Sequence, residues 1–164
     1  MKVSLLRIDD RYIHGQITVK WLSRYKSDMI WVVDDKLAKN PFLKQMQLAT
    51  APENVRTEVL TMKEFLEKWE KSSDNLVFII VSNPEDALTL VENGVELDTM
   101  NIGNMGYKQG KTMVTETVSL DSNDLEALKK ILGKGIKIFY QQVPELGRPI
   151  DFEEKIKERI KEGG

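Results

Sequence analysis

One side chain in this 164-residue chain is well suited to nucleophilic chemistry, the single histidine His14. The sequence contains no cysteine, which excludes thiol nucleophiles, thiolate metal sites and disulfides. A lone histidine also excludes a multi-histidine metal site, and we expect neither a metal nor a cofactor. A neutral imidazole is a good nucleophile toward phosphorus. Any histidine catalysis in this protein must therefore run through His14.

Charged residues lie close to His14 in the sequence. Arg7 and Arg11 precede it by seven and three residues, and guanidinium groups bind phosphate oxygens through paired hydrogen bonds. Asp9 and Asp10 could orient the imidazole or the arginines. The spacing alone is equally compatible with an ordinary surface loop that carries exposed salt bridges.

The elements that must position these residues follow from an alternation of apolar runs and amphipathic segments. Strands are expected at residues 3–8, 29–33, 55–60, 76–81, 99–102 and 136–141. Helices are expected to begin near residues 13, 40, 61, 83, 121 and 152. This order predicts an α/β fold, with an open, mainly parallel, twisted sheet and helices on both faces.

Local signals mark several element boundaries. Thr61 and Glu64 are spaced as a capping box at a helix start. Gly94 and Gly133 are expected to end two helices. Residues 107–118 have no helical period and are predicted to form a small β-hairpin or extended insertion. The three tryptophans and the final apolar positions Phe152, Ile156 and Ile160 are interpreted as core.

Open parallel sheets bind ligands at the carboxyl ends of their strands. The predicted ends here are residues 9–15, 34–35, 82–83 and 103–104. His14 lies in the first of these segments, and the helix that follows it offers free amides that attract anions. Its neighbour Gly15 lets the backbone approach a ligand closely.

One segment partly matches a nucleotide-binding loop. Residues 106–112 read G-Y-K-Q-G-K-T, one residue short of the P-loop spacing. A strand-like segment follows where a P-loop requires a helix, so the match does not support nucleotide binding.

A second alternative is a signalling or binding module without transfer activity, such as a degenerate receiver domain. Asp34 and Asp35 follow a strand, as the acidic pair of a receiver does, but the aspartate and lysine expected after later strands are missing. The two residues are better interpreted as loop groups that end the strand or line the cleft. Acid lability separates the alternatives further, because a phosphoimidazole is labile in acid and stable in base, whereas an acyl phosphate is labile in both.

Composition limits the choice of partners. The 24 basic and 26 acidic side chains nearly cancel, which gives no indication of nucleic-acid binding. No apolar run approaches the 18 residues of a membrane-spanning helix. We therefore expect a single cytoplasmic domain over residues 1–164.

The segment around His14 resembles the active-site segment of a known family. Residues 7–16 read R-I-D-D-R-Y-I-H-G-Q, and the resemblance is to IIB subunits of the mannose/fructose/sorbose family of the bacterial phosphoenolpyruvate-dependent sugar phosphotransferase system (PTS). Further similar stretches are residues 82–88 (S-N-P-E-D-A-L), 101–105 (N-I-G-N-M) and 135–144, which ends in Q-x-V-P. The resemblance covers essentially the whole chain. Tyr12 departs from it, since the family more often has leucine there.

The resemblance implies a phosphohistidine–sugar phosphotransferase. His14 would accept a phosphoryl group from a histidine of the IIA protein and pass it to a sugar translocated by the membrane subunits IIC and IID. IIA is expected to be a separate polypeptide, and the protein is expected to be peripheral at the inner face of the membrane when docked. Mannose, fructose, sorbose and amino sugars all remain open as substrates.

Residue roles follow from the same resemblance combined with charge and geometry. His14 carries the phosphoryl group, at Nδ1 by resemblance, and Arg11 is expected to neutralise its equatorial oxygens. Asp10 is expected among the catalytic residues, as a group that positions the others. The expected phosphate-binding residues are Arg7, Gly15, Gln16 and Ser82.

Overall fold

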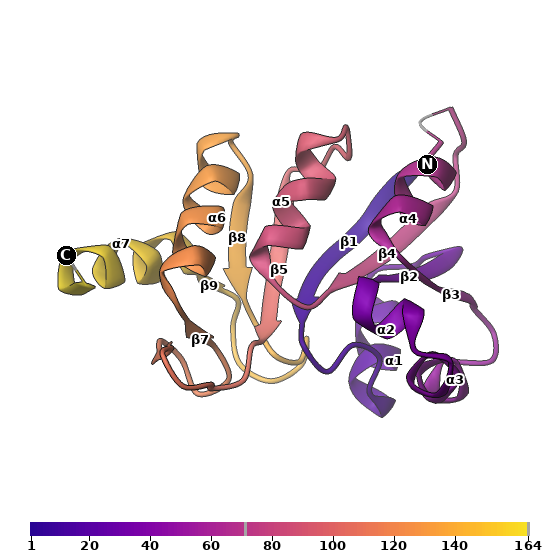
Figure 1. The fold of residues 1–164 in the computed structure, drawn as a ribbon, viewed down its shortest axis with the longest axis horizontal. Helices are drawn as coiled ribbons and strands as arrows, with labels where there is room; N and C mark the ends of the chain where they lie inside the picture. Colours follow the sequence, from indigo (N-terminus) through magenta and orange to yellow (C-terminus); the bar gives the residue numbers. More distant parts are fainter. Residues whose placement is uncertain (71, 164) are drawn as a thin grey trace.

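The computed structural model describes residues 1–70 and 72–163, which form a sheet covered by helices (Figure 1). The seven-stranded sheet has the order β3-β2-β4-β1-β5-β8-β9. Its strands are β1 (Lys2–Asp9), β2 (Met29–Val33), β3 (Arg56–Leu60), β4 (Leu76–Val81), β5 (Thr99–Asn104), β8 (Lys137–Tyr140) and β9 (Ile150–Asp151). All neighbouring strands are parallel except β8 and β9, which confirms the predicted open, mainly parallel sheet.

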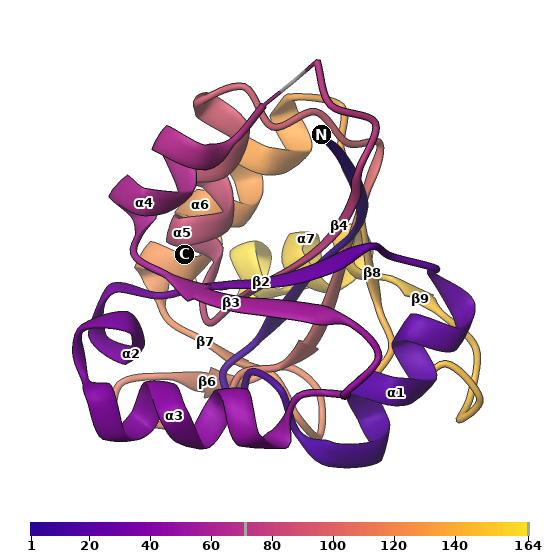
Figure 2. The same ribbon diagram turned by 90° about the vertical axis from the view of Figure 1, so that its right-hand side faces the viewer.

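Helices cover both faces of the sheet, as the alternation of apolar runs predicts (Figure 2). The helices are α1 (Gly15–Arg24), α2 (Asp35–Lys39), α3 (Pro41–Thr50), α4 (Met62–Lys68), α5 (Pro84–Glu92), α6 (Ser122–Gly133) and α7 (Phe152–Gly163). Helices α1 to α3 pack on one face and α4 to α7 on the other.

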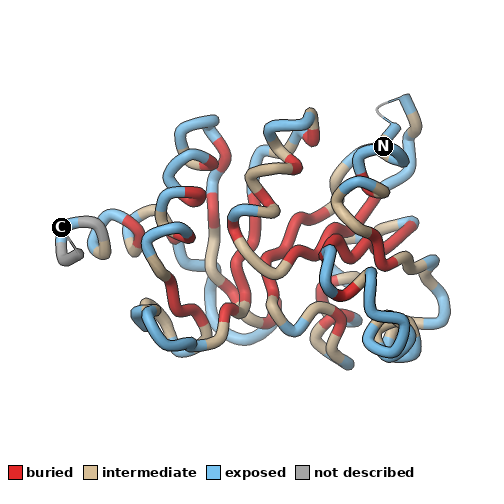
Figure 3. The backbone as a smooth tube through the Cα atoms, viewed as in Figure 1, coloured by how far each residue is buried: buried red, intermediate tan, exposed pale blue. Residues whose placement is uncertain are grey.

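Each face has its own apolar core. On the face of α1 to α3, Trp21 is 1% exposed and packs with strand residues such as Phe78. On the other face, Trp31 packs edge-on against Phe65, with ring centroids 5.4 Å apart, and Phe152 of α7 joins the same cluster. Figure 3 shows buried positions concentrated in the strands. Strands buried on both faces explain why β2 and β4 are nearly pure apolar runs.

The helix starts follow the predicted capping signals. Thr61 and Glu64 form the expected capping box of α4, and Asn40 and Asn83 cap α3 and α5 through their side-chain oxygens. Each cap satisfies an amide that has no partner within the first helical turn. Asp121 caps α6 in the same way.

The helix ends follow the predicted glycine signals. Gly94 has a φ of 100° beyond the end of α5, as expected. Gly133 is the last residue of α6, as predicted, and Gly135 beyond it adopts the left-handed conformation, with a φ of 84°. The side chain of Ile160 lies outside the described residues.

Two short elements are additions to the predicted order. Helix α2 follows directly on β2, and β9 extends the sheet beyond β8, which was expected to be the last strand. The predicted hairpin insertion is present as β6 (Thr112–Met113) and β7 (Ser119–Leu120), an antiparallel pair. Two-residue strands and a single-turn helix carry too little periodicity for sequence patterns to detect. In the described part of the chain, no helix has both the length and the apolar character needed to cross a membrane.

Candidate active site

His14 lies where β1 leads into α1, at the carboxyl end of the central strands (Figure 1). It is the N-cap residue of α1, and its side chain is 20% exposed. The imidazole is therefore accessible from solvent and lies at the amino terminus of a helix.

The imidazole is held by the last residue of β1. His14 Nε2 lies 2.6 Å from Asp9 Oδ2, and the Asp9 side chain is fully buried. Burial is the largest influence on the Asp9 carboxyl and opposes ionisation, but the His14 hydrogen bond and the Arg7 charge outweigh it, so the pKa of Asp9 is lowered.

An ionised Asp9 determines the tautomer of the neutral ring. The carboxylate can only accept, so Nε2 must carry the proton and donate it. The lone pair is then on Nδ1, which makes no hydrogen bond to any described residue. In neutral His14, Nδ1 is thus the nitrogen whose lone pair is free.

Arg7 binds the Asp9 carboxylate from the interior of the protein, and only 2% of Arg7 is exposed. Its Nε and Nη2 donate to Asp9 Oδ2 at 3.2 and 3.0 Å. Nη1 donates to Asn101 Oδ1 and to the carbonyl of Gln141, and Nη2 also donates to the carbonyl of Gln142. A guanidinium group has five N–H donors, and these bonds use all of them. Direct phosphate binding by Arg7 would require at least one of these bonds to be exchanged.

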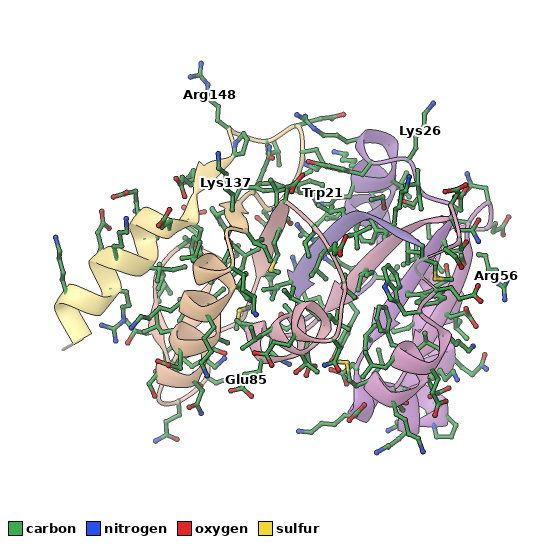
Figure 4. The ribbon with its side chains drawn as sticks, turned by 90° about the horizontal axis from the view of Figure 1, so that it is seen from above. Trp21, Lys26, Arg56, Glu85, Lys137 and Arg148 are labelled. Atoms are coloured by element: carbon green, nitrogen blue, oxygen red, sulfur yellow. The ribbon has the colours of Figure 1, made fainter. Side chains whose placement is uncertain are left out.

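Close packing fixes the Arg7 guanidinium on two further sides. Its Cζ lies 5.0 Å from the centre of the Trp21 ring. Figure 4 shows Trp21 pointing into the interior, whereas the side chains of Lys26 and Arg148 extend into solvent. On β5, a Cβ atom at Gly103 would overlap the guanidinium. Burial lowers the pKa of Arg7, and the charge and hydrogen bonds of Asp9 oppose that effect.

Arg11 differs from Arg7 because its side chain is 46% exposed. Its Nε is 4.0 Å from Asp9 Oδ1, a loose contact, while its backbone N–H donates to the same oxygen at 2.9 Å. The backbone is therefore fixed beside the carboxylate that holds His14, and the guanidinium donors remain available to an arriving anion.

Asp10 faces away from the imidazole. Its carboxylate accepts hydrogen bonds from Asn104 Nδ2 at 2.6 Å and from the N–H of Gly106 at 2.7 Å. Asp10 thus ties the loop after β1 to the end of β5. These contacts fix the position of the loop, and the effect of Asp10 on the chemistry of the site stays a prediction.

Tyr12 and Ile13 anchor the middle of the loop. Ile13 is buried, and its N–H donates to Gln47 of α3 at 2.9 Å. Tyr12 has a φ of 60°, a left-handed conformation that costs a residue with a Cβ atom ~1–2 kcal/mol. Its hydroxyl donates to Asp34 Oδ2 at 2.9 Å.

Ser82 lies in a cavity beside the loop. The cavity has a volume of about 550 Å³, and its lining includes Asp10, Tyr12, Asp34 and Ser82. Ser82 Oγ donates to Asp34 Oδ2 at 3.0 Å. Its hydroxyl proton is thus directed at Asp34, and its phosphate-binding role stays a prediction.

The first turn of α1 supplies backbone donors. Gly15 has a φ of 55°, and no described atom lies within 4 Å of where its Cβ would be. Gly15 and Gln16 are exposed, and the first turn contains no acidic residue. The amides at this helix end are accessible and favour negative charge.

The motifs set aside in the sequence have ordinary structural roles. Residues 106–112 lead into β6 and not into a helix, and Lys111 pairs with Asp124 at 3.1 Å. Asp34 caps α2, and both Asp34 and Asp35 line the cavity, as interpreted from the sequence. Within residues 1–70 and 72–163, no three acidic or histidine side chains are arranged to hold a metal ion.

The structure brings His14, Arg11, Arg7 and the Gly15–Gln16 amides to one place, around the buried Asp9 carboxylate. The sequence left open whether Asp9 or Asp10 orients the ring. It did not identify Asn101, or the carbonyls of Gln141 and Gln142 just after β8, as supports of Arg7. A polar asparagine within a buried apolar strand is the signal that could have indicated Asn101.

Fold and site together define an open α/β protein with one accessible histidine at the carboxyl edge of a parallel sheet. A family described as the PTS system sorbose subfamily IIB component matches residues 3–162. The chain therefore belongs to this family of phosphotransferase-system IIB components, which serve sugar transport.

Individual relatives support this membership. The fructose-specific EIIB component of Bacillus subtilis is 32% identical over 146 residues, 88% of this chain and 90% of that protein. The mannose-specific EIIAB component of Escherichia coli is 35% identical over 145 residues, 87% of this chain but 45% of that longer protein. The IIBSor domain of the sorbose permease from Klebsiella pneumoniae has a TM-score of 0.91 at 31% identity, covering 96% of this chain and 98% of that one.

Proposed function

We propose that residues 1–164 form one IIB domain whose His14 carries a phosphoryl group between a IIA protein and a sugar. The donor is a IIA phosphohistidine, and the acceptor is a sugar bound by the membrane subunits IIC and IID. The protein acts in the cytoplasm and docks at the inner face of the membrane. The observation that carries the proposal is the Asp9–His14 hydrogen bond at Nε2, which leaves the lone pair of a neutral ring on Nδ1.

The transfer step needs little covalent chemistry from the protein. The Nδ1 lone pair of His14 forms the new N–P bond while the N–P bond to the IIA imidazole breaks, and that imidazole leaves with the electron pair. The Nε2 proton stays between His14 and Asp9, so the ring that becomes positively charged faces a carboxylate. Passing the group to a sugar hydroxyl reverses this charge change and releases one proton from the hydroxyl.

The surroundings of His14 suit the charge of the transferred group. Phosphoryl transfer depends mainly on alignment and on neutralising the equatorial oxygens. Arg11 can supply a two-pronged cation from the solvent side, and the amides of Gly15 and Gln16 can supply donors from the helix side. Arg7, with its donors already engaged, supports the reaction by keeping Asp9 ionised and in place.

Phosphorylation of the untagged protein tests the proposal, because a polyhistidine tag would add competing imidazoles. We expect incubation with phosphoenolpyruvate, enzyme I, HPr and a IIA protein to add one phosphoryl group to this chain, measured by mass. The group should be lost in acid and kept in base. His14 is the only histidine, so acid lability assigns the position.

His14→Ala is the matched control. The side chain is partly exposed and not part of either apolar core, so the variant should melt close to the wild-type temperature and take up no phosphoryl group. Uptake by this variant at the wild-type level would contradict the proposal.

A further inference from the structure

The carboxylate of Asp34 joins three segments beside the active-site loop. Its Oδ2 accepts hydrogen bonds from the hydroxyls of Tyr12 and Ser82, and its Oδ1 accepts from the N–H of Leu37 in α2. Asp34 is 8% exposed, and its own N–H is bonded to the Leu60 carbonyl of β3. The carboxylate is therefore fixed to the sheet and to α2, and Tyr12 is the partner from the loop.

Tyr12 needs such a partner because of its backbone. It has a φ of 60° midway between Asp9 and His14, and its N–H donates to the Asp9 carbonyl at 3.0 Å. A residue with a Cβ atom keeps this conformation only where its surroundings impose it. The hydroxyl bond to Asp34 is one such constraint, and the burial of the next residue, Ile13, is another.

The hydroxyl group of Tyr12 contributes a directional hydrogen bond and no apolar contact. Burying a phenolic group without a hydrogen bond is unfavourable, and a phenylalanine would fill the same space without that cost. Burial, followed by the hydrogen bond and charge of Asp34, raises the pKa of Tyr12, so the hydroxyl keeps its proton and remains a donor.

We propose that Tyr12 is a positioning residue, whose hydroxyl bond to Asp34 holds residues 10–15 so that His14 Nδ1 and the helix amides meet the phosphoryl group together. The proposal rests on the phosphoryl-carrier function. Transfer rates are sensitive to placement, since a displacement of ~1 Å can lower a rate ~100-fold.

Tyr12→Phe tests this role, with Tyr140→Phe as the matched control. Tyr140 also has a hydroxyl hydrogen bond at 2.9 Å, to Thr117, but it packs on Phe152 on the sheet face of α4 to α7 and makes no hydrogen bond to a side chain of residues 9–16. Single-turnover transfer from phosphorylated IIA is measured by rapid quench over a range of IIA concentrations. We expect Tyr12→Phe to lower the maximal rate about tenfold or more, with little change in the half-saturating IIA concentration. Tyr140→Phe should transfer as wild type does.

A double-mutant cycle identifies the partner. If Tyr12 acts through Asp34, then Tyr12→Phe should slow the reaction further by less than twofold when Asp34 is already alanine. Full additivity of the two effects would overturn the proposal. Should Asp34→Ala fail to fold because α2 loses its cap, Asp34→Asn serves as the second variant, because its amide oxygen can still cap α2 while its NH2 group cannot accept from Tyr12. Tyr12→Phe should again slow the reaction further by less than twofold in that background.

Amide hydrogen exchange provides a measurement that does not depend on transfer. We expect Tyr12→Phe to speed exchange at residues 10–16 and to shift the NMR signals of the single imidazole, while Tyr140→Phe does neither. Unchanged exchange and signals, or an unchanged maximal rate, would overturn the positioning role. If the wild-type protein accepts no phosphoryl group, the carrier function fails, and the exchange data alone decide whether Tyr12 holds the loop.

Discussion

At the scale of single residues, the site depends on one buried carboxylate with several partners. Asp9 accepts from Arg7, from the backbone of Arg11 and from His14. The buried Arg7 compensates the charge of Asp9 at 3.0 Å. Arg11, at the surface, is only loosely paired with Asp9 at 4.0 Å. The two arginines therefore lie in different environments, one buried and fully hydrogen-bonded and the other half-exposed.

Arg11 is expected to act on the rate of transfer and not on folding. A phosphoryl group adds roughly two negative charges beside Asp9. Because the exposed guanidinium makes only a 4.0 Å contact in the free protein, most of its interaction forms when the phosphoryl group arrives. We expect Arg11→Ala to melt as wild type does and to slow transfer by about 10²-fold or more.

Arg11→Lys distinguishes charge from geometry. Lysine keeps the charge but loses the planar pair of donors, so its rate should lie between those of wild type and Arg11→Ala. Rapid-quench measurements with IIA as donor, on all three proteins, check the order. A wild-type rate for Arg11→Ala would mean that Arg11 is only a solvated loop charge.

At the scale of elements, the sheet supports the site through a close approach of β5 to the side chain of Arg7 on β1. The register pairs Arg7 with Asn101, and the guanidinium extends over the next part of β5, at Gly103. Any side chain at Gly103 would occupy the space of the guanidinium. The glycine is therefore required by packing, without any need for a left-handed backbone.

Gly103→Ala is expected to displace Arg7 and, with it, Asp9. Overpacking of this kind costs about 1–3 kcal/mol of unfolding free energy. Transfer should slow as well, because the Asp9–His14 bond depends on the same carboxylate. Urea unfolding and rapid-quench transfer measure the two effects.

Gly133→Ala is the control for that substitution. Gly133 is helical, and no described atom lies within 4 Å of the position of its Cβ. Alanine there should leave transfer unchanged and raise the unfolding free energy by about 0.4–1 kcal/mol. Equal destabilisation by both substitutions would contradict the packing explanation for Gly103.

At the scale of the whole molecule, the strands meet at one polar edge whose charges influence global stability. Asp9 has a lowered pKa, whereas burial raises the pKa of Asp86 in the neighbouring cavity, and the charges of Asp34 and Asp35 act in the same direction. The two carboxyls therefore change the unfolding free energy with pH in opposite directions.

Asp9 is expected to stabilise the fold above its unfolded pKa of about 3.9 and to lose that contribution as the pH falls through its lower folded pKa. Asp9→Asn leaves the Arg7 charge buried without its counter-ion, which costs about 3–5 kcal/mol near neutral pH. The difference between wild type and variant should shrink below about pH 3.9. Urea unfolding from pH 2 to 7 measures it.

Direct titration of Asp9 is a second check if the variant does not fold. The carboxyl carbon of Asp9 in the wild-type protein should titrate by NMR below the range of an ordinary aspartate. A midpoint above about 4 would contradict the lowered pKa and the proton assignment to Nε2 that depends on it.

The sequence by itself determined the alternation of strands and helices, the sheet type and the chemistry of the loop around His14. Apolar runs such as 76–81 and caps such as Thr61–Glu64 are local signals, because burial on two faces and unpaired helix amides each act over a few residues. Short elements such as α2 and β9 carry too few residues to show a period. The end of α6 at Gly133 was predicted from a local signal as well, whereas the left-handed residue that follows it, Gly135, was not identified.

Only the tertiary structure decided which charges meet. Asp9 and Asp10 are adjacent and chemically identical, yet Asp9 points to His14 and Asp10 to Asn104 and Gly106, since successive side chains at a strand end face opposite ways. Arg7 and Arg11 differ for a similar reason, because one lies within the buried strand and the other in the exposed loop. Contacts across 94 to 135 residues, from Arg7 to Asn101 and Gln142, arise from strand order, which residue spacing in the sequence does not contain.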